Sequence, residues 1–330
     1  MRKSLFILLV YYFVSLTSAE AQTKLIDKDT KYPVPFATIS FGNGNGIFAN
    51  DDGEFLFTKK MYSDIDTLYI SALGYKNIKL PTTNLEKTIS LESFADELDE
   101  VTLTATPKGK FKIEEVDPIH HNDYHQCWLP TIESEIAVFF PNAKKQPKRL
   151  TELYVPIKTE AKEWRKRNRK NTKKRKFSTL FRVQFYENDN GKPGKAITYE
   201  KIVFVATEKN EKFYTLDLEP YNIYSPKNGV FASIQIMGFT DANGKLLPNK
   251  KYQEIKTKRG IVKVSTTFRP LLPFTNKISS KRTFVKRIFL NGGEWILFDK
   301  QNVSKSKLLA AGLNNYGMGL KSKNYYQKQK

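Results

Sequence analysis

The sequence predicts an all-β protein made of two sandwiches, a small one followed by a larger one of jelly-roll type. Three observations support this prediction. Short apolar segments recur about every ten residues, turn sequences rich in glycine and asparagine separate them, and no long segment has a helical period. The charge balance also changes along the chain, which indicates where the first domain ends.

The small sandwich is predicted from segments rich in β-branched and aromatic residues, at 36–41, 47–49, 54–57, 66–72 and 87–91. The sequences GNGNG at 42–46 and NDDG at 50–53 are turns between them, because Gly53 accepts a positive φ and the aspartates bond nearby amides. An Asp-rich turn can instead bind calcium, but the alternating ligand spacing of a calcium loop is absent. We therefore interpret 50–53 as a structural turn.

The larger sandwich is predicted from a second series of segments, at 135–140, 150–157, 177–186, 197–206, 212–218, 229–237, 261–268, 284–289 and 294–298. Turn sequences at 188–194 and 291–293 connect some of them. Residues 182–186 and 233–236 alternate polar and apolar side chains, so we expect each of these strands to show one face to water. The segment 181–187 also loosely resembles sandwich domains found in envelope proteins.

Charge separates these two parts of the chain. Residues 22–106 contain 8 Lys and 13 Asp or Glu, a net charge of −5, and residues 1–21 carry +1. Because the whole chain carries +21, residues 107–330 carry +25. We expect domains at 22–106 and 133–330, joined by a polar linker at 107–132 that contains Pro107, Gly109 and Pro118.

The first residues have the pattern of a secretory signal peptide. Arg2 and Lys3 give a positive start, residues 5–14 are apolar, and Ala19 and Ala21 occupy the positions that a signal peptidase reads. We predict that residues 1–21 are removed and that the protein is exported. The apolar run is too short to span a bilayer, since a spanning helix needs about 20 apolar residues, and we expect no transmembrane segment.

Four ordered blocks, at 27–30, 33–39, 50–55 and 70–75 (DKDT, PVPFATI, NDDGEF and ISALGY), resemble the carboxypeptidase-like regulatory domain, a transthyretin-like β-sandwich. Residues 97–101 (ELDEV) are similar to the segment that follows this domain in envelope proteins. The resemblance implies a non-catalytic accessory module in the bacterial envelope. One departure is the missing glycine before Leu25, which predicts a short first strand.

The resemblance implies no activity, and the sequence contains no recognisable catalytic motif. A zinc carboxypeptidase needs His-x-x-Glu and a distant second histidine, yet all three histidines lie between 120 and 125. We therefore expect no enzyme, no catalytic residue and no cofactor. Carboxylates scattered in sequence can still converge in space, so a hydrolase stays as a lesser alternative. The only cysteine, Cys127, excludes a disulfide within the chain.

A weak candidate metal cluster consists of His120, His121, His125 and Cys127, whose imidazoles and thiol are good zinc or copper ligands. Their spacing lacks the gapped ligand pairs of a zinc site, and adjacent histidines do not easily reach one ion. A surface connector with incidental histidines is the favoured interpretation, and no metal is expected.

The segment 162–176 contains ten Lys or Arg and one Glu, with Trp164 inside it. It lies between two predicted strands, which suggests a mobile hairpin loop of about fifteen residues. Such a loop either is simply solvated or binds a polyanion. The predicted anion-binding side chains are Arg165, Lys166, Arg167, Arg169, Lys170, Lys173, Lys174 and Arg175.

Together these patterns predict an exported, non-enzymatic binding or scaffolding protein of the bacterial cell envelope, periplasmic or associated with the outer membrane. Its expected partner is an anionic glycan, lipopolysaccharide or an envelope protein, and nucleic acid is not expected because of the export signal. A carbohydrate-binding module is the first alternative.

Overall fold

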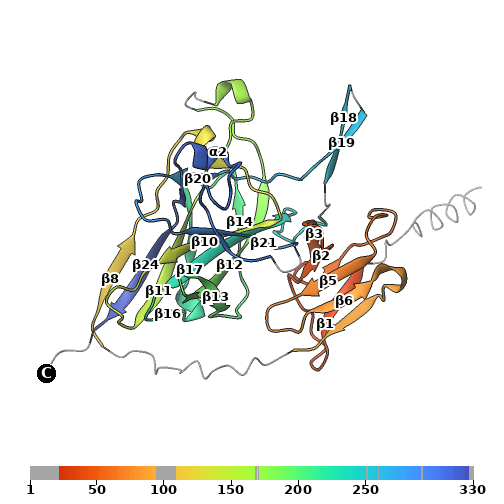
Figure 1. Cartoon of the computed structure of the whole chain (residues 1–330), viewed down its shortest axis with the longest axis horizontal. Coiled ribbons are helices and arrows are strands. Elements are labelled where there is room, and N and C mark those ends of the chain that lie inside the picture. Colours follow the sequence, from red (N-terminus) through yellow and green to blue (C-terminus); the bar gives the residue numbers. More distant parts are fainter. Residues whose placement is uncertain are drawn as a thin grey trace, which may run out of the picture.

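The computed structural model describes residues 22–93 and 109–326, apart from Asn168, Lys170, Lys250, Lys251, Arg259, Asn291 and Gly292. The predicted signal peptide at 1–21 and the segment 97–101 lie outside the described residues. Within them the protein is built from β-sheets, which confirms the all-β prediction (Figure 1). Its two largest clusters of buried apolar residues distinguish an N-terminal module, residues 22–93, from a C-terminal sandwich, residues 109–326.

The N-terminal module packs two small sheets face to face. One has the order β4 (Glu54–Phe55), β1 (Thr23–Asp27) and β7 (Thr88–Leu91), and the other has the order β3 (Gly46–Phe48), β2 (Thr38–Ser40), β5 (Thr67–Ser71) and β6 (Ile78–Pro81). Alternate residues of β1 and β5 are buried, as expected for strands with one face in a core. The core between the sheets includes Leu25, Ile39, Phe55 and Leu68.

Strand β1 differs from the expectation of a short first strand. It spans five residues and lies at the centre of its sheet, antiparallel to β4 and parallel to β7. The turn at 50–53 forms as predicted, but the side chain that bonds the nearby amides is that of Asn50 and not of an aspartate. The Asn50 side chain accepts hydrogen bonds from the amides of Asp52 and Glu54, at 3.0 and 2.8 Å, and Gly53 has a φ of +73°.

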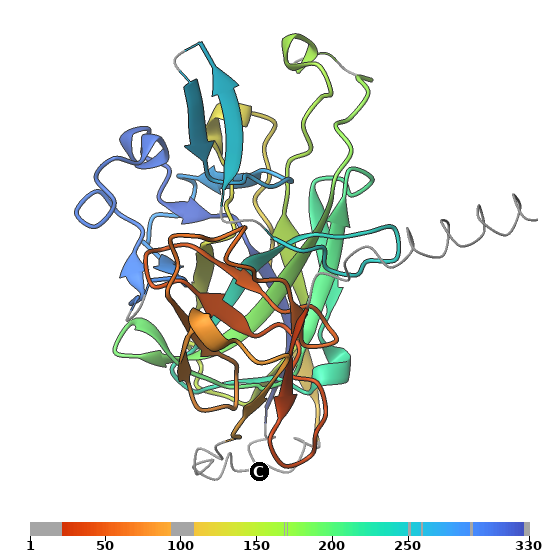
Figure 2. The same cartoon turned by 90° about the vertical axis from the view of Figure 1, so that its right-hand side faces the viewer.

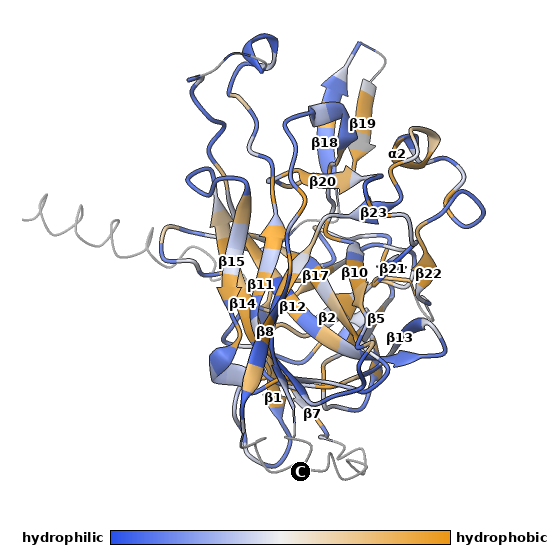
Figure 3. Ribbon diagram, turned by 90° about the vertical axis from the view of Figure 1, so that its left-hand side faces the viewer, coloured by the Kyte–Doolittle hydropathy of each residue, from blue (hydrophilic) through white to orange (hydrophobic). Residues whose placement is uncertain are grey.

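The C-terminal sandwich also has two main sheets. The first has the order β13 (Lys192–Ala196), β12 (Ser178–Asp189), β17 (Val230–Phe239), β10 (Ser134–Phe140), β21 (Thr283–Arg287) and β22 (Ile296–Leu297), with β14 (Ile202–Thr207) also paired to β12. The second has the order β15 (Phe213–Asp217), β11 (Lys148–Pro156), β24 (Gly319–Tyr325) and β8 (Phe111–Val116), with β16 (Tyr224–Ser225) on β11. Buried apolar residues of both sheets form the core between them, and Figure 3 colours many residues of these strands as hydrophobic.

Smaller elements cover one end of this sandwich. A three-stranded sheet has the order β23 (Asn315–Tyr316), β20 (Leu272–Thr275) and β9 (Cys127–Trp128), and a short helix α2 (Lys307–Ala310) lies near it. Strands β18 (Gln253–Thr257) and β19 (Gly260–Val264) form a separate two-stranded sheet that projects away from the body (Figure 1).

The segment predicted as a linker at 107–132 is largely part of the C-terminal sandwich, which corrects that expectation. Its residues 111–116 form β8, an edge strand that pairs antiparallel with β24, and Cys127–Trp128 form β9. The strand β8 was missed because its sequence, FKIEEV, is mostly exposed and lacks a clear apolar alternation.

The N-terminal module is joined to the C-terminal sandwich by buried side chains and hydrogen bonds. Phe36 and Phe48 belong to the core cluster of the sandwich, and the Phe48 ring lies 5.3 Å from the Phe289 ring. The Ser40 hydroxyl donates to the Phe289 carbonyl at 2.7 Å, and the Tyr62 hydroxyl donates to the Asn249 carbonyl at 2.9 Å. The two parts therefore share a packed interface.

Candidate anion-binding site

The basic segment connects two different sheets, which corrects the expectation of a hairpin. It follows β11 and precedes β12, and these strands lie in opposite layers of the sandwich. The segment leaves one end of the sandwich and returns to it (Figure 2). Its two arms pair near their base, where the Lys162 amide donates to the Lys173 carbonyl at 2.8 Å and the Arg175 amide donates to the Glu160 carbonyl at 2.9 Å. We call residues 160–176 the basic loop.

A buried carboxylate anchors the base of the basic loop. The Glu160 side chain is only 9% exposed and forms ion pairs with the guanidinium groups of Arg269 and Arg175, the latter at 3.6 Å. Arg269 comes from a distant part of the chain, and it also donates a hydrogen bond to the Thr267 hydroxyl at 3.3 Å. Because a buried carboxylate needs its partners to offset the loss of water, these ion pairs hold the loop against the sandwich.

Trp164 holds the outer part of the basic loop. It begins the 3₁₀ turn Trp164–Lys166, and its ring contacts Tyr124 and His125 edge to face, with centroid distances of 5.7 and 6.1 Å. The guanidinium of Arg167 lies 4.4 Å from the centre of the indole. An ion pair and aromatic contacts thus anchor the described part of the basic loop at Glu160 and at Trp164. The mobility expected from the sequence stays a prediction.

The predicted anion-binding residues divide into two groups. Lys166 pairs with Glu163 at 2.8 Å, Arg175 pairs with Glu160, and Arg167 stacks on Trp164, so these three act within the loop. The side chains with no ion-pair partner among the described residues, all of them exposed, are Arg165, Arg169, Lys173 and Lys174. Lys170 lies outside the described residues. The loop thus presents several uncompensated cations to solvent.

The structure does not assemble the candidate metal cluster. The ring of His121 bonds the Phe274 carbonyl through Nε2 at 2.8 Å, His125 packs on Trp164, and the Cys127 thiol donates to the Asp123 carbonyl at 3.2 Å. Burial lowers the pKa of His120 to about 4 and raises the pKa of Cys127 to about 12. In the described part of the chain, no three His, Cys, Asp or Glu side chains are grouped to hold a metal ion.

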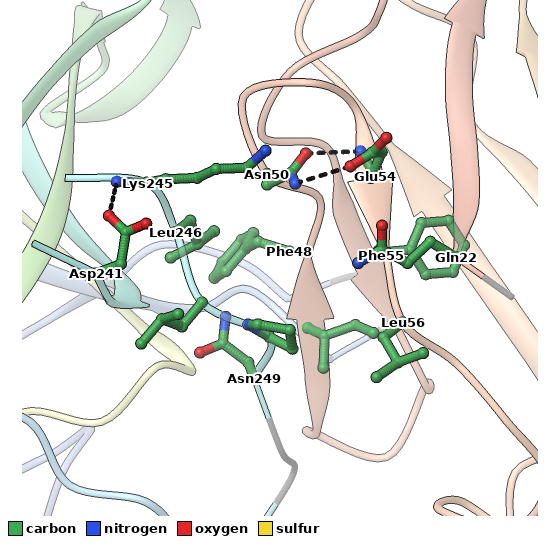
Figure 4. Close-up of a pocket in the computed structure, with 13 residues that line it drawn as sticks. Gln22, Phe48, Asn50, Glu54, Phe55, Leu56, Asp241, Lys245, Leu246 and Asn249 are labelled. Carbon is green, nitrogen blue, oxygen red and sulfur yellow. Dashed lines mark hydrogen bonds between the residues drawn. The ribbon is translucent and has the colours of Figure 1, made fainter. Parts of the chain in front are cut away.

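The interface between the N-terminal module and the sandwich contains a cavity of about 200 Å³ (Figure 4). Asn50 and Glu54 line it from one side, and Asp241, Lys245 and Asn249 from the other. These polar groups bond mainly within the protein: the Asn50 amide donates to Glu54 at 3.3 Å, and the Asn249 amide donates to the Met237 carbonyl at 2.8 Å. The cavity has room for water molecules, and the polar side chains that line it already form hydrogen bonds within the protein.

Comparison with known proteins does not assign this chain to a family. No family model and no curated protein match this chain. Among solved structures, the cysteine protease and lectin-like domains of Cwp84, a surface layer associated protein of Clostridium difficile, match at 9% identity and a TM-score of 0.33. That match covers 64% of this chain and 36% of the other, so this chain spans about a third of its length. The clostridial cysteine protease Cwp84 after propeptide cleavage matches at the same identity and TM-score, over 92% of this chain and 70% of that one.

These matches correct the function expected from the sequence. Because both matching structures belong to a protease, the expectation of a non-enzymatic binding or scaffolding protein of the bacterial cell envelope is contradicted, and we do not retain it. A TM-score of 0.33 carries no catalytic residue or activity over to this chain, so enzyme activity is neither assigned nor excluded. Neither match is a carboxypeptidase-like regulatory domain, and that resemblance stays a prediction. No helix in the described ranges is long and apolar enough to cross a membrane.

Proposed function

We propose that the protein binds a polyanionic partner through the basic loop at one end of the C-terminal sandwich. One observation supports the proposal: the basic loop carries exposed cations that have no ion-pair partner among the described residues, and Glu160 and Trp164 anchor this loop to the protein. The proposal describes a binding site and makes no statement about catalysis.

The chemistry of the basic loop supports an anionic polymer over a single small anion. Guanidinium and ammonium groups bind phosphate, sulfate and carboxylate oxygens with charge-assisted hydrogen bonds. The exposed residues Arg165, Arg169, Lys173 and Lys174 are spread along the loop, so one small anion does not satisfy them all. Because contacts within the protein anchor the loop at Glu160 and Trp164, binding costs less conformational entropy than it would for a loop without such contacts.

We also propose a cellular location for this binding site. Residues 1–21 support export to the periplasm or to the outer membrane, where anionic glycans and lipopolysaccharide present phosphate and carboxylate groups. Export also argues against nucleic acid as the physiological partner. The order of sequence blocks at 27–75 supports an accessory module of the carboxypeptidase-like regulatory type, and the two-sheet packing of the N-terminal module is compatible with it.

Heparin chromatography tests the proposed function, because heparin is a soluble polyanion. The loop variant replaces four of the exposed cations that have no ion-pair partner among the described residues: Arg165→Gln, Arg169→Gln, Lys173→Gln and Lys174→Gln. Each cation near an anionic surface contributes about 1 kcal/mol at low salt, so this variant should bind about a hundredfold to a thousandfold more weakly. It should therefore elute at clearly lower salt than the wild type.

A far-end variant provides a control of equal charge change. It replaces exposed lysines at the opposite end of the sandwich: Lys144→Gln, Lys145→Gln, Lys192→Gln and Lys227→Gln. The proposal predicts a much smaller change in elution salt for this variant. Equal shifts for the two variants would show that net charge, and not the basic loop, controls retention, and the proposal would then be wrong.

A further inference from the structure

The two-stranded sheet of β18 and β19 exposes apolar side chains that no element in the described part of the chain covers. Within the described residues its two strands pair only with each other, over five registered positions. Ile255, Val262 and Val264 are 46%, 45% and 39% exposed. A lone two-stranded hairpin is marginally stable in water, and large exposed apolar residues gathered on one element indicate an interaction surface.

The register places these apolar residues on one face of the hairpin. Ile255 lies opposite Val262, and Gln253 lies opposite Val264, so these four side chains share a face. Residues 254, 256 and 261 belong to the other face, since successive side chains in a strand alternate. That second face carries the charged groups of Glu254 and Lys256. We call the face with Ile255, Val262 and Val264 the apolar face.

The hairpin and the basic loop project from the same end of the C-terminal sandwich. Figure 2 shows both rising beyond the sandwich, the hairpin in blue-green and the loop in yellow-green, and Figure 3 shows the same arrangement from the opposite side. The basic loop adds an indole that is 47% exposed, Trp164, to its cations. One end of the molecule therefore combines an amphipathic hairpin, a half-exposed tryptophan and a concentration of positive charge.

An anionic lipid surface fits this combination better than other occupants. Positively charged residues are attracted to anionic headgroups, tryptophan favours the membrane interface, and an amphipathic element lies with its apolar side in the acyl boundary. A second copy of this chain is disfavoured, because each copy would bring another basic loop and a strongly positive net charge, +20 without residues 1–21, to the contact. A soluble glycan would use the cations and leave the apolar face exposed.

We propose that the apolar face of the β18–β19 hairpin lies on an anionic lipid surface while the basic loop contacts the headgroups. This inference rests on the proposed function and specifies its partner. The protein then attaches peripherally, by two projections that touch the bilayer together. Binding through both is stronger than through either alone, because the second contact forms at a high local concentration.

Sedimentation with vesicles tests the inference, using phosphatidylcholine alone and phosphatidylcholine mixed with phosphatidylglycerol. The full chain should sediment with the mixed vesicles and not with phosphatidylcholine alone. Val262→Ser removes one residue of the apolar face and should weaken vesicle binding about tenfold. Ile261→Ser is the matched control, since Ile261 is the neighbouring residue, is 60% exposed and lies on the other face, and it should change binding less than about twofold.

Heparin elution of the same variants separates the two proposals. Both serine variants should elute from heparin like the wild type, which also shows that they are folded. If the wild type binds heparin but not mixed vesicles, or if the two serine variants bind vesicles equally, the lipid inference is overturned and the proposed function stands. If the wild type and the loop variant elute from heparin alike, the proposed function itself fails.

Discussion

Substitution of Glu160 by glutamine tests whether this carboxylate anchors the basic loop. The change keeps the size of the side chain and one carbonyl oxygen that can accept from Arg269, and it removes the negative charge shared by Arg269 and Arg175. In the wild type the Glu160 side chain is 9% exposed and Arg269 is 18% exposed, so this ion pair is largely shielded from water. Glu160→Gln should therefore destabilise the protein.

The expected size of this effect follows from the two ion pairs. Replacing a charge-assisted hydrogen bond to Arg269 by a neutral one costs about 1–1.5 kcal/mol, because bonds to charged groups contribute roughly that much more. The Arg175 pair is half exposed and longer, and it adds no more than about 0.5 kcal/mol. The free energy of unfolding should thus fall by about 2 kcal/mol. For a chain of 330 residues, whose entropy of unfolding is about 2.1 cal/mol/K per residue, this corresponds to a Tm lower by about 3 °C.

Differential scanning calorimetry of Glu160→Gln and three further variants checks this value. Glu163→Gln is the matched control, because Glu163 is a loop glutamate whose pair with Lys166 is exposed to solvent, and its Tm should stay within the error of the measurement. Arg269→Met should destabilise the protein, and the double variant with Glu160→Gln should lose less than the sum of the two single variants. Additive losses, or equal Tm values for Glu160→Gln and Glu163→Gln, would refute the role of Glu160 as an anchor.

Three further predictions concern other groups of the protein. Burial lowers the pKa of His120 to about 4 in the folded state, so the unfolded chain binds more protons between about pH 4 and 6.5. The free energy of unfolding should therefore fall as the pH is lowered through this window. His120→Asn should flatten the dependence of Tm on pH there, and an unchanged slope would contradict this prediction. Burial raises the pKa of Cys127 to about 12, so little reactive thiolate is present in the folded protein at pH 8. Iodoacetamide should label the folded protein at least about a hundredfold more slowly than the protein unfolded in urea. Equal rates would show an accessible thiolate and contradict this prediction. At Gly53, which has a φ of +73°, a Cβ would lie 2.5 Å from the Leu25 carbonyl oxygen. Gly53→Ala should therefore lower the free energy of unfolding, measured by urea denaturation, by about 2 kcal/mol or more. An unchanged free energy would contradict the interpretation of 50–53 as a turn that requires glycine.

The sequence predicted those strands whose side chains alternate clearly, and it failed for others. Strands β12 and β17 were placed correctly, but the expectation that residues 233–236 show one face to water is wrong, because β17 is buried on both faces. A second apolar cluster that includes Phe231, Phe284 and Trp295 covers the face away from the main core. On that face the Ser233 hydroxyl donates to Glu135, and the Gln235 side-chain carbonyl accepts from Arg182.

The central strand β24 was missed because its inward side chains include Ser322 and Asn324, which are polar. Their side chains donate to the backbone carbonyl and the carboxylate of Glu114 on β8, at 3.3 and 3.0 Å, and sequence alone does not show that long-range pairing.

The candidate site was partly visible in the sequence. The run of cations and the embedded Trp164 identified the basic loop, because charge density is a local property of the sequence. The groups that hold the loop were not identifiable, since Tyr124 and Arg269 lie forty residues or more from Trp164 along the chain. The apolar face of the β18–β19 hairpin was also missed, because residues 261–268 looked like a strand of the sandwich core.

Hydrogen–deuterium exchange of the wild type with and without a heparin oligosaccharide tests the central claim most directly. Amides of residues 160–176 should exchange more slowly when the oligosaccharide is bound, and the turns at 141–147 and 226–229 should be unaffected. Protection located at those turns, or around the cavity between the N-terminal module and the sandwich, with none in the basic loop, would contradict the account.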